Sequence, residues 1–384
     1  MLPQSPVAAQ VLSLTNSIGI YIHIPFCRSK CNYCAFYSVC ADENTTAAYC
    51  KSLIEQITKR GSNLFRPVSS VYFGGGTPSV LSSEQLTSIL SAVKQSFSVS
   101  EDAEITIEVN PADDLEVLLP TLYKNGFNRL SLGIQSGNDN ELLLLGRRHN
   151  KDRAKEAVKI ARKSGFKNIS VDLMLGLPES TTESLKNSLN FILGLNTEHI
   201  SAYILKLEKG TPMYQMSNSL KMPDDDMVAE QYLFMSDYLK QNEFYHYEIS
   251  NFAKKGYESR HNSAYWECGE YLGFGPAAHS FYEGNRYYFD DSVDDFINNP
   301  HPIPDGKGGN EEEYIMLGLR LSKGISNTEF KQKFGKELPQ GIFNKAQKMA
   351  GNGLLKTDGD KISLTAHGML VYNTIITELL EELN

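Results

Sequence analysis

The amino-acid sequence predicts an α/β fold made of a partial (β/α)6 barrel, a C-terminal extension and a small winged-helix-like domain. Two observations predict the barrel. From Gly19 to about Leu207, six short strand-like runs alternate with helical stretches, which is the pattern of repeated βα units and a parallel sheet. Four of these runs have one apolar and one polar face, whereas a sheet covered by helices on both sides would show nearly continuous apolar runs. After residue 207 the pattern changes, which predicts separate additional parts.

The six strand-like runs are, in chain order, IGIYIHI, SSVYF, EITIEV, RLSLGI, ISVDLML and HISAYIL. Alternate side chains of a strand point to opposite faces. On this basis the polar faces of the third, fourth and fifth runs carry Glu108, Gln135 and Asp172. We therefore expect helices on the apolar side and a polar, ligand-filled concave side, with the reactive end at the carboxyl ends of the strands.

Several helices between these runs have recognisable ends. The helix near Ser83 to Phe97 follows Ser82 and has Gln85 three residues further on, which is the spacing of a capping box. Two more helices, near residues 115–125 and 151–164, run into Gly126 and Gly165. Glycine is favoured just past a helix end because it accepts a left-handed backbone. These signals place the helices between the strands, as a βα barrel requires.

The remaining chain reads as an extension and a small domain. Residues 208–290 are rich in aromatic residues and contain HNSAYWECGEYLGFGPAAHS, and the following acidic stretch DDSVDDFINNPHPIPDGKGGNEEE predicts a surface connection. From Glu312 to Leu380 the pattern predicts three helices and then two short strands around the turn Asp358-Gly359, similar to a winged helix. We predict a flexible tail at 1–17, a barrel at 18–207, the extension at 208–310 and the winged-helix-like domain at 311–384.

Composition and charge limit the classes of partner. Lysine and arginine total 37 against 46 acidic residues, a formal charge of −9, so no general attraction to nucleic acid or anionic lipid is expected. We therefore expect a structural or partner-docking role for the winged-helix-like domain. Residues 1–17 lack the features of a secretory signal or a membrane span. Five of the six cysteines crowd into 24 positions, which is not a secreted disulfide framework and favours a reducing cytoplasm.

The stretch IYIHIPFCRSKCNYCAF places Cys27, Cys31 and Cys34 directly after the first predicted strand. One interpretation is a zinc site with Cys40 as the fourth ligand, although this spacing is not a usual one for zinc fingers. The other is an iron–sulfur cluster, which normally takes four cysteines. With three cysteines, one iron is left open to a small ligand, as catalytic zinc sites leave one position open for substrate.

This C-x3-C-x2-C spacing after the first strand of a βα barrel resembles the radical S-adenosylmethionine (SAM) superfamily. The resemblance implies that Cys27, Cys31 and Cys34 bind a 4Fe–4S cluster, that SAM chelates the open iron, and that one electron cleaves SAM to a 5′-deoxyadenosyl radical. The stretch VYFGGGTPS is neither a P-loop nor a dinucleotide fingerprint, but it is similar to the superfamily segment that binds the methionine amino group. The cofactor-binding positions implied by the resemblance are Tyr21, Tyr33, Gly75, Gly76, Thr77, Glu108, Gln135, Arg147 and Asp172.

Within the superfamily, YIHIPFC, GGGTP, GFNRLSLGIQS and DLMLGLP resemble the oxygen-independent coproporphyrinogen III oxidase family over about residues 18 to 380. One branch of this family is the oxidase, a dehydrogenase of heme biosynthesis with a further cysteine where this chain has Phe36. The other is the heme chaperone (HemW) branch, which transfers heme to respiratory enzymes. HNSAYW, from His261 to Trp266, matches the HNxxYW motif of the chaperone branch, whose histidine is implicated in heme binding.

Other candidates are weaker. His279 is a second candidate for heme, His23 is expected to be a packing group, and the other thiols, Cys268 among them, are expected to be ordinary. The resemblance therefore implies a radical SAM heme chaperone with client hemoproteins as partners. Two alternatives stay open: a coproporphyrinogen III dehydrogenase, and a zinc-stabilised adaptor. Contact with a membrane is expected only through clients, since no span or basic amphipathic anchor is visible.

Overall fold

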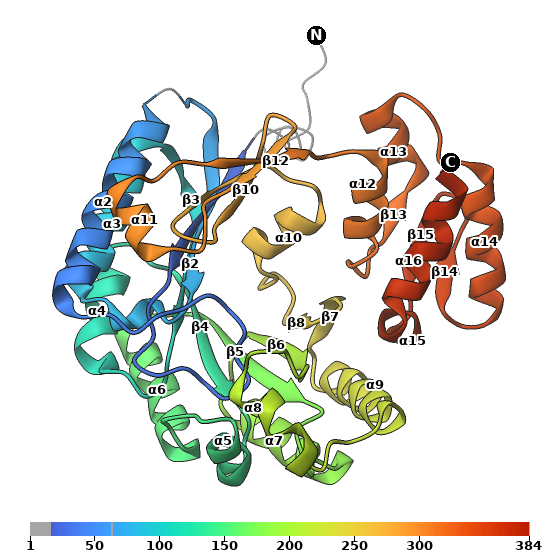
Figure 1. Cartoon of the computed structure of the whole chain (residues 1–384). Helices are drawn as coiled ribbons and strands as arrows, with labels where there is room; N and C mark the ends of the chain where they lie inside the picture. Colours follow the sequence, from blue (N-terminus) through green and yellow to red (C-terminus); the bar gives the residue numbers. More distant parts are fainter. Residues whose placement is uncertain (1–16, 63, 384) are drawn as a thin grey trace. The chain divides into compact units, whose positions relative to one another are not determined.

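The computed structural model describes residues 17–62 and 64–383 (Figure 1). The predicted tail at 1–17 therefore falls almost entirely outside the described residues. The chain divides into two compact units whose segments are interleaved. Unit 1 comprises Met1–Asp172, Lys206–Ser219 and Gly269–Gly306, and unit 2 comprises Leu173–Leu205, Leu220–Cys268 and Lys307–Asn384. The domain boundaries at 207/208 and 310/311 stay a prediction.

Unit 1 is built on parallel strands. The strands β1 (Ile18–Ile24), β2 (Pro67–Gly75), β3 (Ser98–Val109) and β4 (Arg129–Gln135) pair in this order, each parallel to the next. The next strand, β5 (Asn168–Leu175), begins in unit 1 and ends in unit 2. These are the first five runs predicted from the sequence, so the predicted α/β fold with a parallel core is confirmed.

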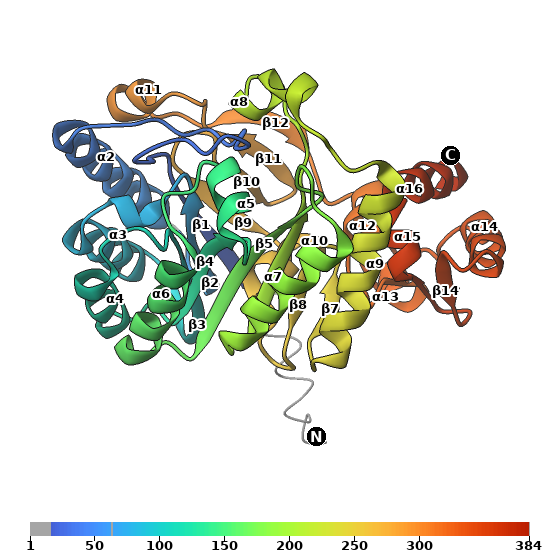
Figure 2. The same ribbon diagram turned by 90° about the horizontal axis from the view of Figure 1, so that it is seen from below.

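The helices of unit 1 follow the strands as predicted. They are α2 (Glu43–Gly61), α3 (Ser83–Ser96), α4 (Leu115–Lys124), α5 (Asp139–Leu144) and α6 (Lys151–Ser164). Figures 1 and 2 show α2, α3, α4 and α6 on the same side of β1 to β4. The capping box of Ser82 and Gln85 is present, and Gly165 ends α6 with φ at 112°.

The two faces of the strands differ as predicted. Ile107, Leu132 and Ile134 are fully buried on the helix-covered side. On the other side the carboxylate of Glu104 lies 3.9 Å from Arg129 Nε, and both side chains are buried. A buried charge is tolerated when it is paired, so this side is a polar layer.

A further strand of unit 1 was not predicted. β9 (Tyr271–Phe274) pairs parallel with β1, on the edge opposite to β2. The order continues through β10 (His279–Tyr282), β11 (Asn285–Tyr288) and β12 (Ile303–Lys307). The stretch predicted to be a bare surface connection thus contains β12 and also α11 (Val293–Asn298), whose Val293 and Phe296 are buried. Short elements such as these carry too few residues for a clear periodicity. Unit 1 also includes α8 (Pro212–Gln215) and the single turns at Pro78–Val80 and Ser217–Ser219.

The last predicted strand, β6 (His199–Ile204), lies in unit 2. It pairs antiparallel with β8 (Asn251–Ala253), which pairs antiparallel with β7 (Tyr245–Glu248). Its first helices are α7 (Thr182–Gly194), α9 (Asp225–Gln241) and α10 (Arg260–Trp266). The motif HNSAYW therefore lies on a short helix. Within the described residues, no helix is long and apolar enough to cross a membrane.

The C-terminal part of unit 2 has the predicted order of elements. The helix α12 (Glu311–Gly318) is followed by β13 (Ile325–Ser326), α13 (Asn327–Phe334) and α14 (Gln340–Gly351). The hairpin of β14 (Leu355–Thr357) and β15 (Lys361–Leu364) completes a sheet of order β13-β15-β14. Gly359 turns the hairpin with φ at 94°. The prediction of a winged-helix-like domain is confirmed, and α15 (Ala366–Leu370), α16 (Tyr372–Leu380) and a turn at Glu381–Leu383 follow it.

Candidate functional site

The cysteine loop leaves the end of β1 and returns beside it. Cys27 N donates to Val39 O at 3.0 Å, and Val39 N donates to Pro25 O at 2.8 Å. These bonds close the base of the loop, and Cys27, Cys31 and Cys34 lie between them as free, half-buried thiols. A loop that is tied at its base holds its side chains near the carboxyl end of β1, where the reactive end of such a sheet is expected.

Two loops from elsewhere in unit 1 contact these thiols. Cys27 Sγ lies 3.4 Å from Thr77 Oγ1, in the loop after β2. Arg147, which follows α5, donates from Nη1 to Cys31 Sγ at 3.2 Å. Burial by itself would lower the pKa of Arg147, but Tyr33, Cys31 and Asp172 outweigh it and raise that pKa. The guanidinium therefore stays charged beside the thiols, and its Nε is a buried atom without a hydrogen-bond partner among the described residues.

The glycine loop after β2 packs directly against β1 and the start of the cysteine loop. Gly76 N donates to Ile24 O and Thr77 N to Phe26 O, both at 2.8 Å. A Cβ at Gly75 would lie 2.7 Å from the His23 ring, and one at Gly76 would lie 2.7 Å from Phe26 O. Gly75 also has φ at 113°, which L-residues with a side chain rarely adopt. Glycine is thus required at positions 75 and 76 because the backbone of this loop lies so close to β1 and the cysteine loop that a side chain would not fit.

Glu108, at the end of β3, is a carboxyl group of the site whose pKa is raised. Tyr72 donates a hydrogen bond from its hydroxyl to Glu108 Oε1 at 2.8 Å. Burial raises the pKa of Glu108 to about 7, Asp172 contributes in the same direction, and the Tyr72 hydrogen bond opposes the rise. A carboxyl group with this pKa is ready to ionise when a cationic group comes close to it.

Three predicted residues converge on Gly133 in β4. A Cβ at Gly133 would lie 3.0 Å from Gln135 Nε2, 3.2 Å from Arg147 Nη2 and 3.9 Å from Asp172 Oδ2. Ser131 donates to Asp172 Oδ1 at 3.3 Å. Gln135 is a buried non-glycine residue with φ at 75°, and such strain is stored where the surrounding structure requires it. The structure thus brings Gln135, Arg147 and Asp172 together.

Tyr21 and Tyr33 complete the predicted set in unit 1. The Tyr21 ring stacks on Tyr72 with centroids 6.3 Å apart, and its hydroxyl lies 3.1 Å from His23 Nδ1. Burial raises the pKa of both tyrosines. His23 is buried, and burial lowers its pKa to about 4, so it is neutral. It packs between Tyr21 and the cysteine loop.

The donor set fits an iron–sulfur cluster better than a single zinc ion. Within residues 17–62 and 64–383, no three His, Cys, Asp or Glu side chains lie close enough to share one metal ion. A structural zinc site requires four ligands around one ion, and Cys40 is exposed, with Sγ 3.7 Å from Arg28 O. In a cluster, by contrast, each thiolate binds a different iron. The thiols therefore need not converge on one point.

Two residues of this site were missed from the sequence. The side chain of Asn32 donates from Nδ2 to Leu144 O at 2.9 Å. The main-chain carbonyl oxygen of Asn32 accepts a hydrogen bond from Met213 N at 2.9 Å. Tyr72 is the hydrogen-bond partner of Glu108. No local signal identifies either residue, because the partners are remote in the chain.

In unit 2, α10 presents the motif residues in a closed arrangement. The His261 side chain is 1% exposed, and its Nε2 lies 2.6 Å from the hydroxyl of Tyr265. Trp266 is half-buried, and the guanidinium of Arg320 lies 4.1 Å from its ring centroid. Arg320 is also 3.8 Å from the fully buried carboxylate of Glu248. The predicted heme histidine is therefore engaged with another residue of its own motif.

The surroundings of His279, Cys268 and Cys50 give no sign of a metal or heme site. His279 is exposed and stacks on Tyr288 in unit 1, with centroids 5.4 Å apart. Cys268 is buried. Cys50 is also buried, and burial raises its pKa to about 12, so it is an unreactive thiol.

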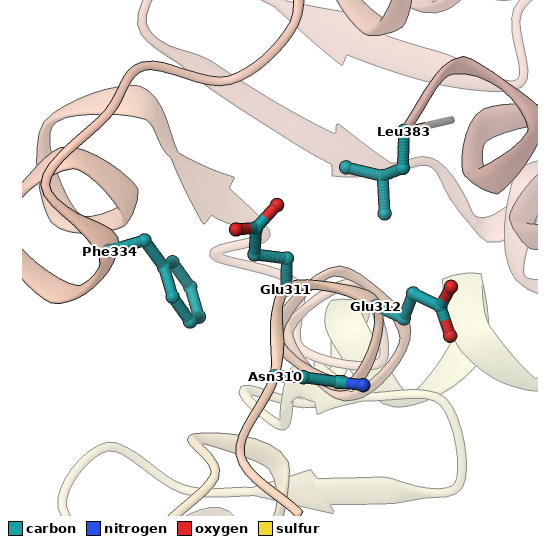
Figure 3. A pocket seen from close by; sticks show the side chains of 5 residues that line it. All are labelled: Asn310, Glu311, Glu312, Phe334 and Leu383. Atoms are coloured by element: carbon teal, nitrogen blue, oxygen red, sulfur yellow. The ribbon is translucent and has the colours of Figure 1, made fainter.

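A separate cavity of about 410 Å³ lies in unit 2 (Figure 3). Its lining residues are Asn310, Glu311, Glu312, Phe334 and Leu383. Figure 3 shows the Glu311 carboxylate between Phe334 and Leu383, whereas that of Glu312 points away. Glu311 is paired with Lys336 at 2.9 Å. None of the residues predicted to be functional lines this cavity.

The chain is similar to known proteins over nearly its whole length. The family model "Radical SAM superfamily" matches residues 21–192, and the model "HemN C-terminal domain" matches residues 312–371. The heme chaperone HemW of Bacillus subtilis is 35% identical over 376 residues, which is 94% of this chain and 99% of that protein. A mitochondrial radical S-adenosyl methionine domain-containing protein 1 from Mus musculus is 33% identical, with 99% and 90% covered.

Among solved structures, the coproporphyrinogen III oxidase HemN of Escherichia coli is similar, with a TM-score of 0.81. The match covers 98% of this chain and 93% of the other, at 22% identity. At this identity the likeness concerns the fold. It agrees with the parallel-strand core of unit 1 and with the C-terminal domain of unit 2.

Proposed function

The chain belongs to the radical SAM superfamily and, within it, to the family of the HemW heme chaperones, and from this premise we propose that it binds heme and delivers it to client hemoproteins such as respiratory enzymes. The observation that carries the proposal is the pair formed by His261 and Tyr265 on α10. Histidine and tyrosine are both side chains that bind heme iron in proteins. The composition of the chain supports a reducing cytoplasm as its place of action.

We assign the cofactor site to unit 1. Cys27, Cys31 and Cys34 would hold the 4Fe–4S cluster, which when bound supplies one electron and an open iron position for SAM. Arg147, charged and in contact with Cys31 Sγ, stabilises negative charge on the thiols or on a ligand carboxylate. Glu108, whose pKa is raised by burial, is suited to a cationic part of SAM. Gly75 and Gly76 let the loop after β2 pack closely against β1 and the start of the cysteine loop, which would keep this loop beside the cluster.

The alternative, a coproporphyrinogen III dehydrogenase, has less support. The likeness to the Escherichia coli oxidase concerns the fold. Phe36, at the position where the oxidase branch has a further cysteine, is 73% exposed and offers no iron ligand. The zinc-stabilised adaptor lacks a set of four convergent ligands among the residues that the structure describes.

Two assays test the proposal. The reconstituted protein is titrated with heme under anaerobic conditions, followed by absorbance, and then mixed with an apo-hemoprotein to measure transfer. We expect saturable heme binding and transfer, and weakened heme binding in His261→Ala. Separately, the protein is incubated with coproporphyrinogen III, reductant and SAM. Decarboxylated porphyrinogen formed at a catalytic rate would contradict the chaperone proposal, and absence of iron and sulfide after reconstitution would contradict the cluster.

A further inference from the structure

We propose that Asp113, in the loop after β3, is a positioning residue that holds four loops of the candidate cofactor site in fixed places. This inference rests on the proposed assignment of the cofactor site to unit 1 and adds a residue that acts through others. It is carried by the ion pairs and hydrogen bonds between the buried Asp113 carboxylate and the loops around the cysteines.

The Asp113 carboxylate is 1% exposed and contacts side chains from three other loops. Its Oδ1 accepts a hydrogen bond from Arg148 Nη2 at 2.7 Å and lies 3.5 Å from Arg28 Nε. Its Oδ2 accepts a hydrogen bond from the Ser79 hydroxyl at 2.6 Å. A buried carboxylate is stable only when opposite charges and donors compensate it. Asp113 and these three partners therefore hold one another in place.

The two arginines are close in the chain to residues of the candidate cofactor site. Arg28 directly follows Cys27, and Arg148 directly follows Arg147. Arg147 in turn donates a hydrogen bond to Cys31 Sγ at 3.2 Å. A shift of either partner arginine would therefore be passed along the backbone, in one case to a thiol and in the other to the guanidinium that contacts a thiol.

Ser79 extends the same network to the remaining two loops. It lies two residues after Thr77, whose hydroxyl contacts the thiol of the first cysteine of the loop. The Ser79 hydroxyl oxygen also accepts a hydrogen bond from Asn110 N at 3.0 Å, and Asn110 lies two residues after Glu108. Through this hydroxyl, the loop after β2 and the end of β3 are joined to Asp113.

The loop that carries Asp113 is itself tied down. Asp113 N donates to Asn110 O, and Ala112 N donates to Asn110 Oδ1, both at 3.0 Å. Arg153, in the first turn of α6, donates from Nε to Pro111 O at 2.8 Å and from Nη2 to Asp113 O at 2.6 Å. The main chain of Asp113 is thus a fixed point, to which its carboxylate holds the other loops.

These contacts preorganise the cofactor site. A ligand binds more weakly to a site whose competent arrangement is only partly populated, in proportion to that population. Without the negative charge of Asp113, Arg28 and Arg148 would lose the anion that compensates both of them. The loops that carry them would then separate more easily, and the binding of SAM would have to bring them together again.

The test compares four proteins after anaerobic reconstitution of the cluster: the wild-type chain, Asp113→Asn, Arg148→Gln and the control Asp114→Asn. Asparagine keeps the shape of Asp113 and one acceptor oxygen but loses the charge. Asp114 is the next residue, is exposed and precedes α4, where asparagine is as suitable as aspartate. Arg148→Gln removes one partner from the more exposed side of the network, so it provides a second variant if Asp113→Asn does not fold.

Three properties are measured for each protein. They are the iron and sulfide content, the dissociation constant for SAM from equilibrium dialysis, and the electron paramagnetic resonance spectrum of the reduced cluster with and without SAM. Circular dichroism checks the fold. A merely structural role of Asp113 would lower stability but would leave the dissociation constant and the spectral response of the folded protein unchanged.

We expect Asp113→Asn to keep its cluster but to bind SAM about tenfold more weakly, as when the competent arrangement is present in about one molecule in ten. The spectral change on adding SAM should then need a correspondingly higher SAM concentration. Arg148→Gln should weaken SAM binding by a smaller factor, because Asp113 keeps Arg28 and Ser79 as partners. Asp114→Asn should match the wild type in all three measurements.

Wild-type SAM affinity and spectral response in a folded, cluster-loaded Asp113→Asn protein would overturn the inference. So would an equal loss in Asp114→Asn, since the effect would then be one of charge in general. If Asp113→Asn does not fold, wild-type SAM affinity in Arg148→Gln decides against the inference. Loss of cluster iron from a folded Asp113→Asn protein, with full iron in Asp114→Asn, would support it, because Arg28 adjoins Cys27.

These outcomes are separate from the test of the proposed function, which measures heme binding and transfer. A wild-type protein that takes up no iron and sulfide would overturn the cofactor assignment and, with it, the role of Asp113. Failure of heme transfer by a protein that binds SAM normally would contradict the chaperone proposal and leave the role of Asp113 standing.

Discussion

Unit 1 assembles its candidate cofactor site from distant stretches of chain, whereas unit 2 places its histidine and tyrosine on one turn of a helix. The cysteine loop after β1 is contacted by Thr77 and Arg147, and Glu108 and Asp172 come from two further strands. His261 and Tyr265 need only α10 to meet. The first site therefore depends on the whole sheet, because parallel strands end at the same edge. The second depends on the anchoring of one short helix.

The largest effect is expected in unit 1, when a cluster ligand is removed. We expect Cys31→Ala to lose cluster iron and sulfide almost completely after anaerobic reconstitution, since an iron would lack its thiolate. Cys40→Ser is the matched control, because Cys40 lies near the same loop and is exposed. Equal loss of iron in both variants would mean that Cys40 is also a ligand of the cluster.

The next effect probes the anchoring of α10 in unit 2. Arg320→Leu removes the cation beside the fully buried carboxylate of Glu248 and the packing on Trp266. We expect the free energy of unfolding to fall by about 3 kcal/mol, the lower end for leaving a buried charge unpaired, as measured by denaturant unfolding.

The control for this variant is Lys323→Leu. Lys323 pairs with Glu267 through side chains that are both about half exposed, and such a pair contributes about 0–1 kcal/mol. If Arg320→Leu and Lys323→Leu lower the free energy of unfolding by the same amount, the pair of Arg320 and Glu248 does not anchor α10.

The third effect is expected in unit 1, at Gly75, where the backbone lies close to His23. Gly75→Ala combines a left-handed backbone with a Cβ placed 2.7 Å from the His23 ring. We expect a loss of about 2 kcal/mol in the free energy of unfolding. Gly210→Ala separates the two causes, because Gly210 has φ at 89° but nothing within 4 Å of the added Cβ. Its cost should be about 1 kcal/mol; an equal cost for Gly75→Ala would show that the contact with His23 is relieved without strain.

The smallest effect is a pH dependence. Burial raises the pKa of Glu108 to about 7 in the folded protein. If the ionised carboxylate contacts a cationic part of SAM, the affinity for SAM is highest above this pKa and falls as the pH drops through it. Calorimetric titration across this range should show the fall in the wild type, and Glu108→Gln should flatten it. An affinity for SAM that rises as the pH drops would contradict the role of Glu108.

Some local features could be predicted from the sequence because the residues that determine them lie close together in the chain. The alternation in EITIEV and RLSLGI predicted which side of β3 and β4 is polar, and the Ser82–Gln85 spacing predicted the start of α3. The pairing of β9 with β1 was not readable. β9 is a four-residue aromatic strand, and its partner lies at the other end of unit 1 in sequence. The hydrogen bond from Tyr72 to Glu108 was hidden for the same reason.

The sequence by itself determined the βα repeat, the polar strand faces, the cysteine spacing and the motif HNSAYW, because each of these is a property of neighbouring residues. The tertiary structure decided that Arg147 lies beside Cys31, that Gln135 and Asp172 meet at Gly133, and that the buried His261 contacts Tyr265. Such contacts follow from the packing of strands and loops, and packing is set by the whole chain at once. The sequence therefore indicates candidate ligands, and the fold determines which of these residues come together.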